Sequence, residues 1–78
     1  MLIVKPNLVV NLNNVNDFSK YTDSDLSIFA IKFYFNHWDE GEQMFTSFVF
    51  ENEEKRDLAF ESIINAADMQ CQTVKLIS

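Results

Sequence analysis

The residue types best suited to chemistry gather in the segment from His37 to Glu42. It holds the only His, the only Trp and the only Gly of the chain, together with three carboxylates. An imidazole beside carboxylates is a combination that serves acid–base catalysis or binds a divalent cation. Zinc sites, however, draw on several nitrogen or sulfur ligands, and His37 and Cys71 are the only such side chains here. We therefore interpret the segment as a polar hairpin loop and expect no metal site.

Other motifs of known sites are incomplete. Asp23-Ser24-Asp25 begins like a calcium loop, but Ile28 and Tyr34 stand where that loop has its Gly and its final Glu. A single Gly cannot build a glycine-rich phosphate loop. Nothing in the sequence pairs the one His with a nucleophile and an orienting acid, as hydrolytic triads require. The sequence therefore predicts no catalytic residue, no cofactor and no enzymatic activity.

The charge of the chain disfavours several classes of partner. Six Lys and Arg against twelve Asp and Glu give a net charge of −6 on 78 residues, which repels nucleic-acid phosphates and anionic lipids. The first ten residues, with Lys5 and Pro6 inside a short apolar stretch, match neither a secretion signal nor a membrane span. One Cys cannot form an internal disulfide, so we expect a reducing, cytoplasmic location.

The elements that must position these residues follow from hydrophobic periodicity, and the length predicts one domain over residues 1–78. Alternating apolar residues predict two strong strands, Leu26–Asn36 and Gln43–Glu51. Weaker strands are expected at Leu8–Leu12 and from Val15 to Tyr21. The segment Leu2–Val4 is expected as an edge strand or as the bulged start of the next strand.

A helix is expected after the second strong strand. Asn52 suits the N-cap, and Glu53 and Glu54 suit the positive end of the helix dipole. The helix places its apolar residues on one face, namely Phe60, Ile63, Ile64, Ala66 and Ala67. Thr73–Ile77 is expected to return as a strand. The sequence thus predicts an α+β fold: an antiparallel β-meander of four to five strands with one amphipathic helix on one face and a short final strand.

The two strong strands have two apolar faces, and one helix can cover only one of them. Phe29, Ile31, Phe33 and Phe35 alternate on the face expected to form the core. The other face carries Ile28, Ala30, Tyr34, Phe45 and Val49. Trp38 either anchors the rim of an interface or folds back over the sheet.

Exposed apolar patches of this kind usually mark an interface. We therefore expect a non-catalytic protein-interaction module whose partner is another protein or a second copy in a homodimer. Alternatively, the N-terminal segment and the last strand curl over this face and close a barrel-like core.

A second hypothesis rests on the acidic residues of the helix. Glu53, Glu54, Asp57 and Glu61 would form an acidic docking face that mimics nucleic acid or enters a basic cleft of a partner protein. Such a face is equally typical of an ordinary solvated helix.

Overall fold

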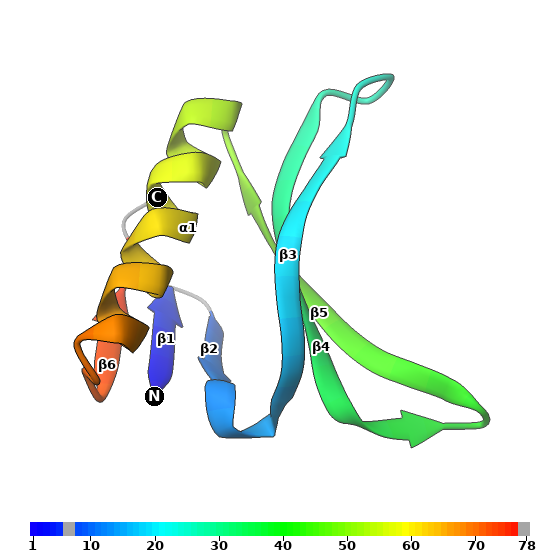
Figure 1. Cartoon of the computed structure of the whole chain (residues 1–78). Coiled ribbons are helices and arrows are strands. Elements are labelled where there is room, and N and C mark those ends of the chain that lie inside the picture. Colours follow the sequence, from blue (N-terminus) through cyan, green and yellow to red (C-terminus); the bar gives the residue numbers. More distant parts are fainter. Residues whose placement is uncertain (6–7, 77–78) are drawn as a thin grey trace.

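The computed structural model describes residues 1–5 and 8–76. Within these ranges the elements are β1 (Leu2–Lys5), β2 (Leu8–Asn11), η1 (Leu12–Asn14), β3 (Val15–Asp23), β4 (Ile28–Asp39), β5 (Glu42–Phe50), α1 (Glu53–Asp68) and β6 (Thr73–Lys75). The strands form two three-stranded sheets, β2-β1-β6 and β3-β4-β5 (Figure 1). The predicted α+β class, with mostly antiparallel pairing, one helix and a strand after it, is confirmed.

The first sheet departs from the predicted meander. β1 lies between β2 and β6, so its expected place at a sheet edge is wrong. It pairs antiparallel with β2 and parallel with β6, where Ile3 lies opposite Val74. A parallel pair needs a long crossover connection. Here the connection between β1 and β6 contains every element from β2 to α1, so the sequence shows no local strand–helix–strand pattern that would predict a parallel pair. The expectation of a single antiparallel meander is therefore wrong. Of the predicted last strand, Ile77 lies outside the described residues.

The second sheet is an antiparallel meander, as expected, but its central strand is shifted along the chain. The predicted start at Leu26 is wrong, because Leu26 and Ser27 lie in the turn that joins β3 to β4. β4 runs to Asp39 and pairs there with Glu42 at the start of β5. His37 to Asp39 are therefore strand residues, and their prediction as a loop is wrong. Glu40 and Gly41 alone form the turn, with φ angles of 52° and 84°. Two successive positive φ angles are typical of the tight hairpin turns whose twist matches that of the strands.

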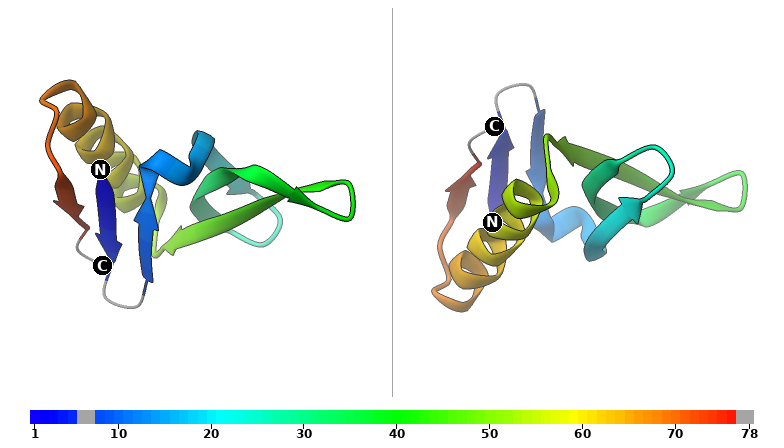
Figure 2. Two further views of the ribbon diagram at one scale, coloured as in Figure 1. Left: turned by 90° about the horizontal axis from the view of Figure 1, so that it is seen from below. Right: turned by 90° about the horizontal axis from the view of Figure 1, so that it is seen from above.

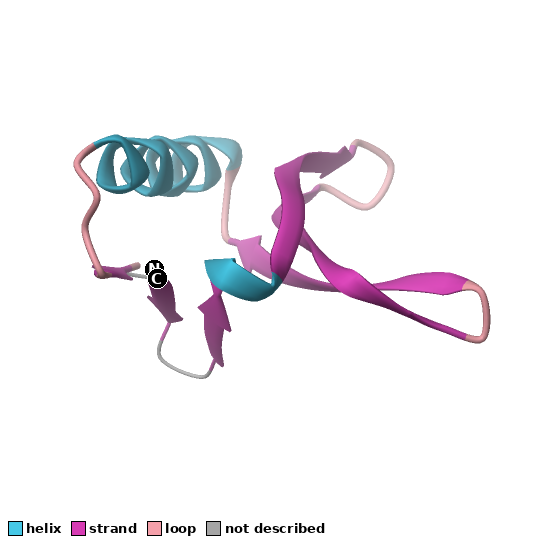
Figure 3. Cartoon of the chain, turned by 60° about the horizontal axis from the view of Figure 1, so that its bottom comes forward, coloured by secondary structure: helices cyan, strands magenta, loops and turns pink. Residues whose placement is uncertain are grey.

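The hydrophobic core lies between α1 and the two sheets, which Figure 3 shows around a common interior. Its members come from both sheets, from α1 and from the segment after β6: Ile3, Val10, Ile31, Phe33, Phe48, Phe50, Ala59, Ile63 and Leu76. The predicted core face of β4 is confirmed, since Ile31 and Phe33 are fully buried. The N-terminal strands and the end of the chain pack on this same face. The alternative in which they curl over the opposite face is therefore wrong.

The helix begins as predicted. The side-chain oxygen of Asn52 accepts a hydrogen bond from the backbone N–H of Lys55 at 2.9 Å. The buried stripe consists of Arg56, Ala59, Ile63 and Ala66, at the three- and four-residue spacing of one helix face. Ile64 and Ala67 were expected on the buried face, but both are exposed. The middle of the buried face lies at Ala59 and Ile63, so Ile64 and Ala67 fall at its margin. Among the described residues, no helix is long and apolar enough to cross a membrane.

Candidate interaction surface

The face of the second sheet that points away from α1 is only partly covered. We call it the open face, and strand register assigns to it Tyr21 of β3, Ile28, Ala30, Lys32 and Tyr34 of β4, and Phe45 and Val49 of β5. Phe45 is 52% exposed and Val49 is 55% exposed, which is unusual for neighbouring apolar residues on a sheet. This face therefore presents apolar side chains to the surroundings of the molecule.

A lysine lies among the aromatic rings of the open face. Lys32 Nζ is 4.0 Å from the centroid of the Tyr21 ring and 5.2 Å from that of Phe45. The rings of Tyr34 and Phe45 pack against each other with centroids 5.7 Å apart. A cation over aromatic rings is attracted to their electron-rich faces, and its stem covers apolar surface. The open face is thus an aromatic surface with one positive charge near its middle.

The predicted interface residues lie at different depths. Phe45 and Val49 are exposed, Ile28 and Tyr34 are half-buried, and Ala30 is only 1% exposed. Ala30 therefore supports its neighbours and offers almost no surface of its own. Tyr21 belongs to this face but is absent from the predicted set. Its membership follows from the pairing of Tyr21 with Ala30, which the sequence of β3 alone does not specify.

The end of the β4–β5 hairpin projects beyond the third strand. Pairing between β3 and β4 reaches only Val15 and Phe35, so residues 36–44 form a two-stranded ribbon that we call the arm. Figure 2 shows the arm pointing away from α1 in two views. Trp38 is 59% exposed on it and does not fold back over the sheet. Isolated two-stranded ribbons are marginally stable in water, so a projecting arm of this kind gains from contact with another molecule.

Two side chains of the arm make contacts within the hairpin itself. The imidazole of His37 stacks on the Phe35 ring, with centroids 5.6 Å apart. The amide of Gln43 donates to the backbone oxygen of Phe35 at 2.9 Å, where the pairing of β4 and β5 is irregular. In the described part of the chain, no three His, Cys, Asp or Glu side chains gather into a group that could hold a metal ion.

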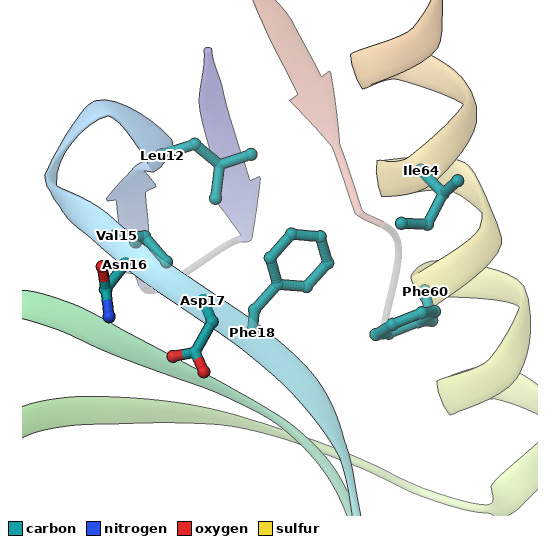
Figure 4. A pocket seen from close by; sticks show the side chains of 7 residues that line it. All are labelled: Leu12, Val15, Asn16, Asp17, Phe18, Phe60 and Ile64. Atoms are coloured by element: carbon teal, nitrogen blue, oxygen red, sulfur yellow. The ribbon is translucent and has the colours of Figure 1, made fainter.

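A pocket of about 350 Å³ opens between η1, the start of β3 and α1. Its lining residues are Leu12, Val15, Asn16, Asp17, Phe18, Phe60 and Ile64 (Figure 4). The rings of Phe18 and Phe60 lie side by side with centroids 5.5 Å apart, and Leu12 and Ile64 lie on either side of them. Hydrophobic periodicity does not reveal this pocket, because it arises where η1 turns the chain from one sheet into the other.

The acidic residues of α1 share one side of its first turns, as their spacing predicts. Asp57 is held between two cations: Arg56 Nε donates to its Oδ1 at 2.7 Å, and Lys20 Nζ lies 3.3 Å from the same atom. These contacts, that of Arg56 first, lower the pKa of Asp57. Glu53, Glu54 and Glu61 are exposed beside it. The acidic face is therefore partly neutralised by cations of this chain.

Comparison with protein-family models, with curated proteins and with solved structures gave no match to this chain.

Proposed function

We propose that this protein is a non-catalytic protein-interaction module that associates with a second copy of itself through the open face and the arm. The observation that carries this proposal is the exposure of Phe45 and Val49 on a sheet face that neither α1 nor the N-terminal sheet covers. Contact between water and such an apolar patch is unfavourable in free energy, so covering the patch with another apolar surface lowers the free energy of the system.

A second copy is favoured as the partner because the open face carries charges of both signs. Register places Asp17 and Asp23 of β3 on the same face as Lys32 of β4. In a twofold-symmetric dimer each patch meets its own copy, so a surface with acids at its edge and a cation near its middle can complement itself. The acids would then pair with the lysine of the other copy.

A dimer of standard size would bury a substantial part of this surface. A stable interface of standard size buries about 800 Å² on each partner. The whole chain exposes 5373 Å², so the open face and the arm together would have to supply about a seventh of it.

Sedimentation velocity over a range of concentrations tests this proposal. We expect a monomer–dimer equilibrium at micromolar concentrations, and we expect Phe45→Glu to shift it strongly toward the monomer by placing charges in the interface. Leu58→Glu is the matched control, because Leu58 is also exposed but lies on α1 away from the open face. A chain that stays monomeric up to high micromolar concentration contradicts the proposal, as does equal behaviour of the two variants.

The proposal places this module in the cytoplasm, without nucleic-acid or membrane partners. The net charge of −6 supports the exclusion of anionic partners. The exposed thiol of Cys71 supports a reducing compartment, where exposed thiols persist.

The acidic docking hypothesis has weaker support, since Lys20 and Arg56 already pair with Asp57. The hypothesis predicts a basic partner protein whose affinity for this chain falls steeply with added salt. That affinity should be lost in a Glu53→Lys, Glu54→Lys double variant.

A further inference from the structure

We propose that Trp38 on the arm of one copy inserts into the pocket between η1, β3 and α1 of a second copy. This inference rests on the proposed self-association through the arm and adds a second contact site, the pocket, which lies at the β3 edge of the second sheet on its α1 side. Both halves of the contact are present in each chain: an exposed indole on a projecting ribbon, and an apolar pocket that the side chains of the same chain leave open.

The pocket suits a large aromatic side chain. Its volume of about 350 Å³ falls within the range of roughly 300–1,000 Å³ that ligand-sized groups occupy in proteins. The rings of Phe18 and Phe60 offer surfaces against which an indole can stack or pack edge to face. Asn16 and Asp17 complete its lining at the start of β3.

Trp38 does not fill the pocket of its own chain. The arm points away from α1, which forms one wall of the pocket, and Trp38 is not among the lining residues. The indole is therefore free to enter a binding site on another molecule. Tryptophan is among the residues most enriched as buried anchors of protein interfaces, and such anchors sit in pockets of the partner.

The positions of the arm and the pocket suit a reciprocal exchange. Val15 lines the pocket and pairs with Phe35 at the base of the arm, so the two sites lie close together along the sheet. Two copies related by a twofold axis can then insert each Trp38 into the other's pocket. Such an arrangement closes as a dimer and leaves no arm or pocket free to extend a chain of copies.

The fluorescence of Trp38 tests this contact directly, because it is the only Trp in the chain. The full chain is studied over a dilution series, with sedimentation measured in parallel. We expect the emission maximum to move to shorter wavelength, and acrylamide quenching to fall, in step with dimer formation. Trp38→Ala should weaken the dimer by roughly 30-fold or more, the loss typical of a buried anchor residue.

The pocket is tested from its other side with Ile64→Glu. Ile64 is 40% exposed, so its replacement leaves the buried core intact, which circular dichroism verifies. We expect this variant to weaken the dimer and to return Trp38 to long-wavelength emission. Ile64→Gln, which adds no charge, should have the same effect to a smaller degree. Leu58→Glu, on the same helix but outside the pocket, should leave both readouts unchanged.

The possible results separate this inference from the proposed function. Suppose that the chain dimerises and that Phe45→Glu dissociates the dimer. If Trp38 emission then responds neither to dimerisation nor to the two Ile64 variants, or to only one of these, the module dimerises without the exchange and the inference is wrong. If no dimer forms at any concentration, both the self-association and the exchange are wrong.

Discussion

Arg56 and Asp57 are adjacent residues that fasten α1 to β3. Arg56 is 4% exposed, and its Nη1 donates to the backbone oxygen of Tyr21 at 2.8 Å and to Oγ1 of Thr22 at 3.1 Å. Asp57 neutralises this guanidinium and also pairs with Lys20 of β3. Burying a charge is costly unless it is paired and hydrogen-bonded, and here both conditions are met. Two side chains thereby join the helix to the edge of the second sheet.

The lowered pKa of Asp57 predicts a contribution to acid sensitivity. Hydrogen bonding from Arg56, and secondarily from Lys20, holds this pKa below the ordinary value of 3.8. A carboxyl whose pKa is depressed in the folded state stabilises that state at any pH above its unfolded pKa. This contribution is lost as the pH falls from the unfolded pKa through the folded pKa. We expect the urea midpoint of the wild type to fall more steeply below about pH 4 than that of Asp57→Asn.

The matched control is Asp68→Asn, which removes a carboxyl at the other end of α1, away from Arg56 and Lys20. Its urea midpoint should follow the wild-type dependence on pH. Indistinguishable pH profiles for wild type and Asp57→Asn would show that the contacts of Asp57 do not contribute to stability.

Single residues were predictable where local pattern sets their environment. The capping role of Asn52 follows from its side-chain chemistry and its place before the helix. The burial of Ala30 could not be predicted in the same way, since neighbouring strands set it through a register that the sequence does not encode locally. For the same reason Tyr21 was missed as part of the open face.

At the scale of the element, the arm depends on its two-residue turn. The φ angle of Gly41 is 84°, and a Cβ built there meets no atom within 4 Å. A substitution is therefore opposed by backbone conformation and not by a clash. The left-handed conformation costs a residue with a side chain about 1–2 kcal/mol, and more when that side chain is β-branched.

We expect Gly41→Val to open the arm without unfolding the core. Backbone amides of residues 36–44 should exchange with solvent deuterium about tenfold faster or more, as a local loss of 1–2 kcal/mol implies. The amides of Ile31 and Phe33 should exchange at the wild-type rate. Gly41→Asn is the control, because Asn tolerates positive φ and should preserve protection of the arm. Equal acceleration in the arm and the core would contradict this local role.

The strongest elements were predictable because their signals are local, although β4 begins two residues later and ends three residues later than its pattern predicts. Capping and helical periodicity give α1, and alternation gives the buried parts of β4 and β5. The arm was missed because His37, Trp38 and Asp39 have no apolar alternation facing a core. They are strand residues through pairing with β5, which depends on the tight turn at Glu40 and Gly41.

At the scale of the whole molecule, both sheets and the helix share one core. Leu76, which follows β6, is 6% exposed and packs in the same cluster as Ile31 of β4 and Ile63 of α1. Its backbone N–H donates to the oxygen of Val4 at 2.7 Å, which extends the parallel pairing of β1 and β6. A defect at this position should therefore weaken all parts of the fold together.

We expect Leu76→Ala to lower the free energy of unfolding by about 2–5 kcal/mol, the range for large-to-small changes in a core. Urea transitions followed by aromatic and by backbone circular dichroism should coincide in the variant and in the wild type, because one shared core unfolds cooperatively. A matched Met69→Ala change, at a side chain that is 75% exposed, should cost far less. Separate transitions for the two probes would mean that the sheets unfold independently.

The division into two sheets was beyond sequence reasoning. Strand pairing between chain positions as distant as Ile3 and Val74 depends on the packing of everything between them. Periodicity identifies a strand but not its neighbour, so it could not place β1 in the centre of a sheet. The candidate interaction surface was easier to predict, because the sequence shows two apolar strand faces and only one helix to cover them.

The central place of β1 bears on how this protein forms in a cell. β1 is translated before β6, so one side of it has no partner until residues 73–75 have left the ribosome. Until then its free edge can pair with strands of other nascent chains. The first sheet can therefore close only after residues 73–75 have been translated, and the interval between translation of β1 and closure of the β1–β6 pair is when this part of the chain is most open to aggregation.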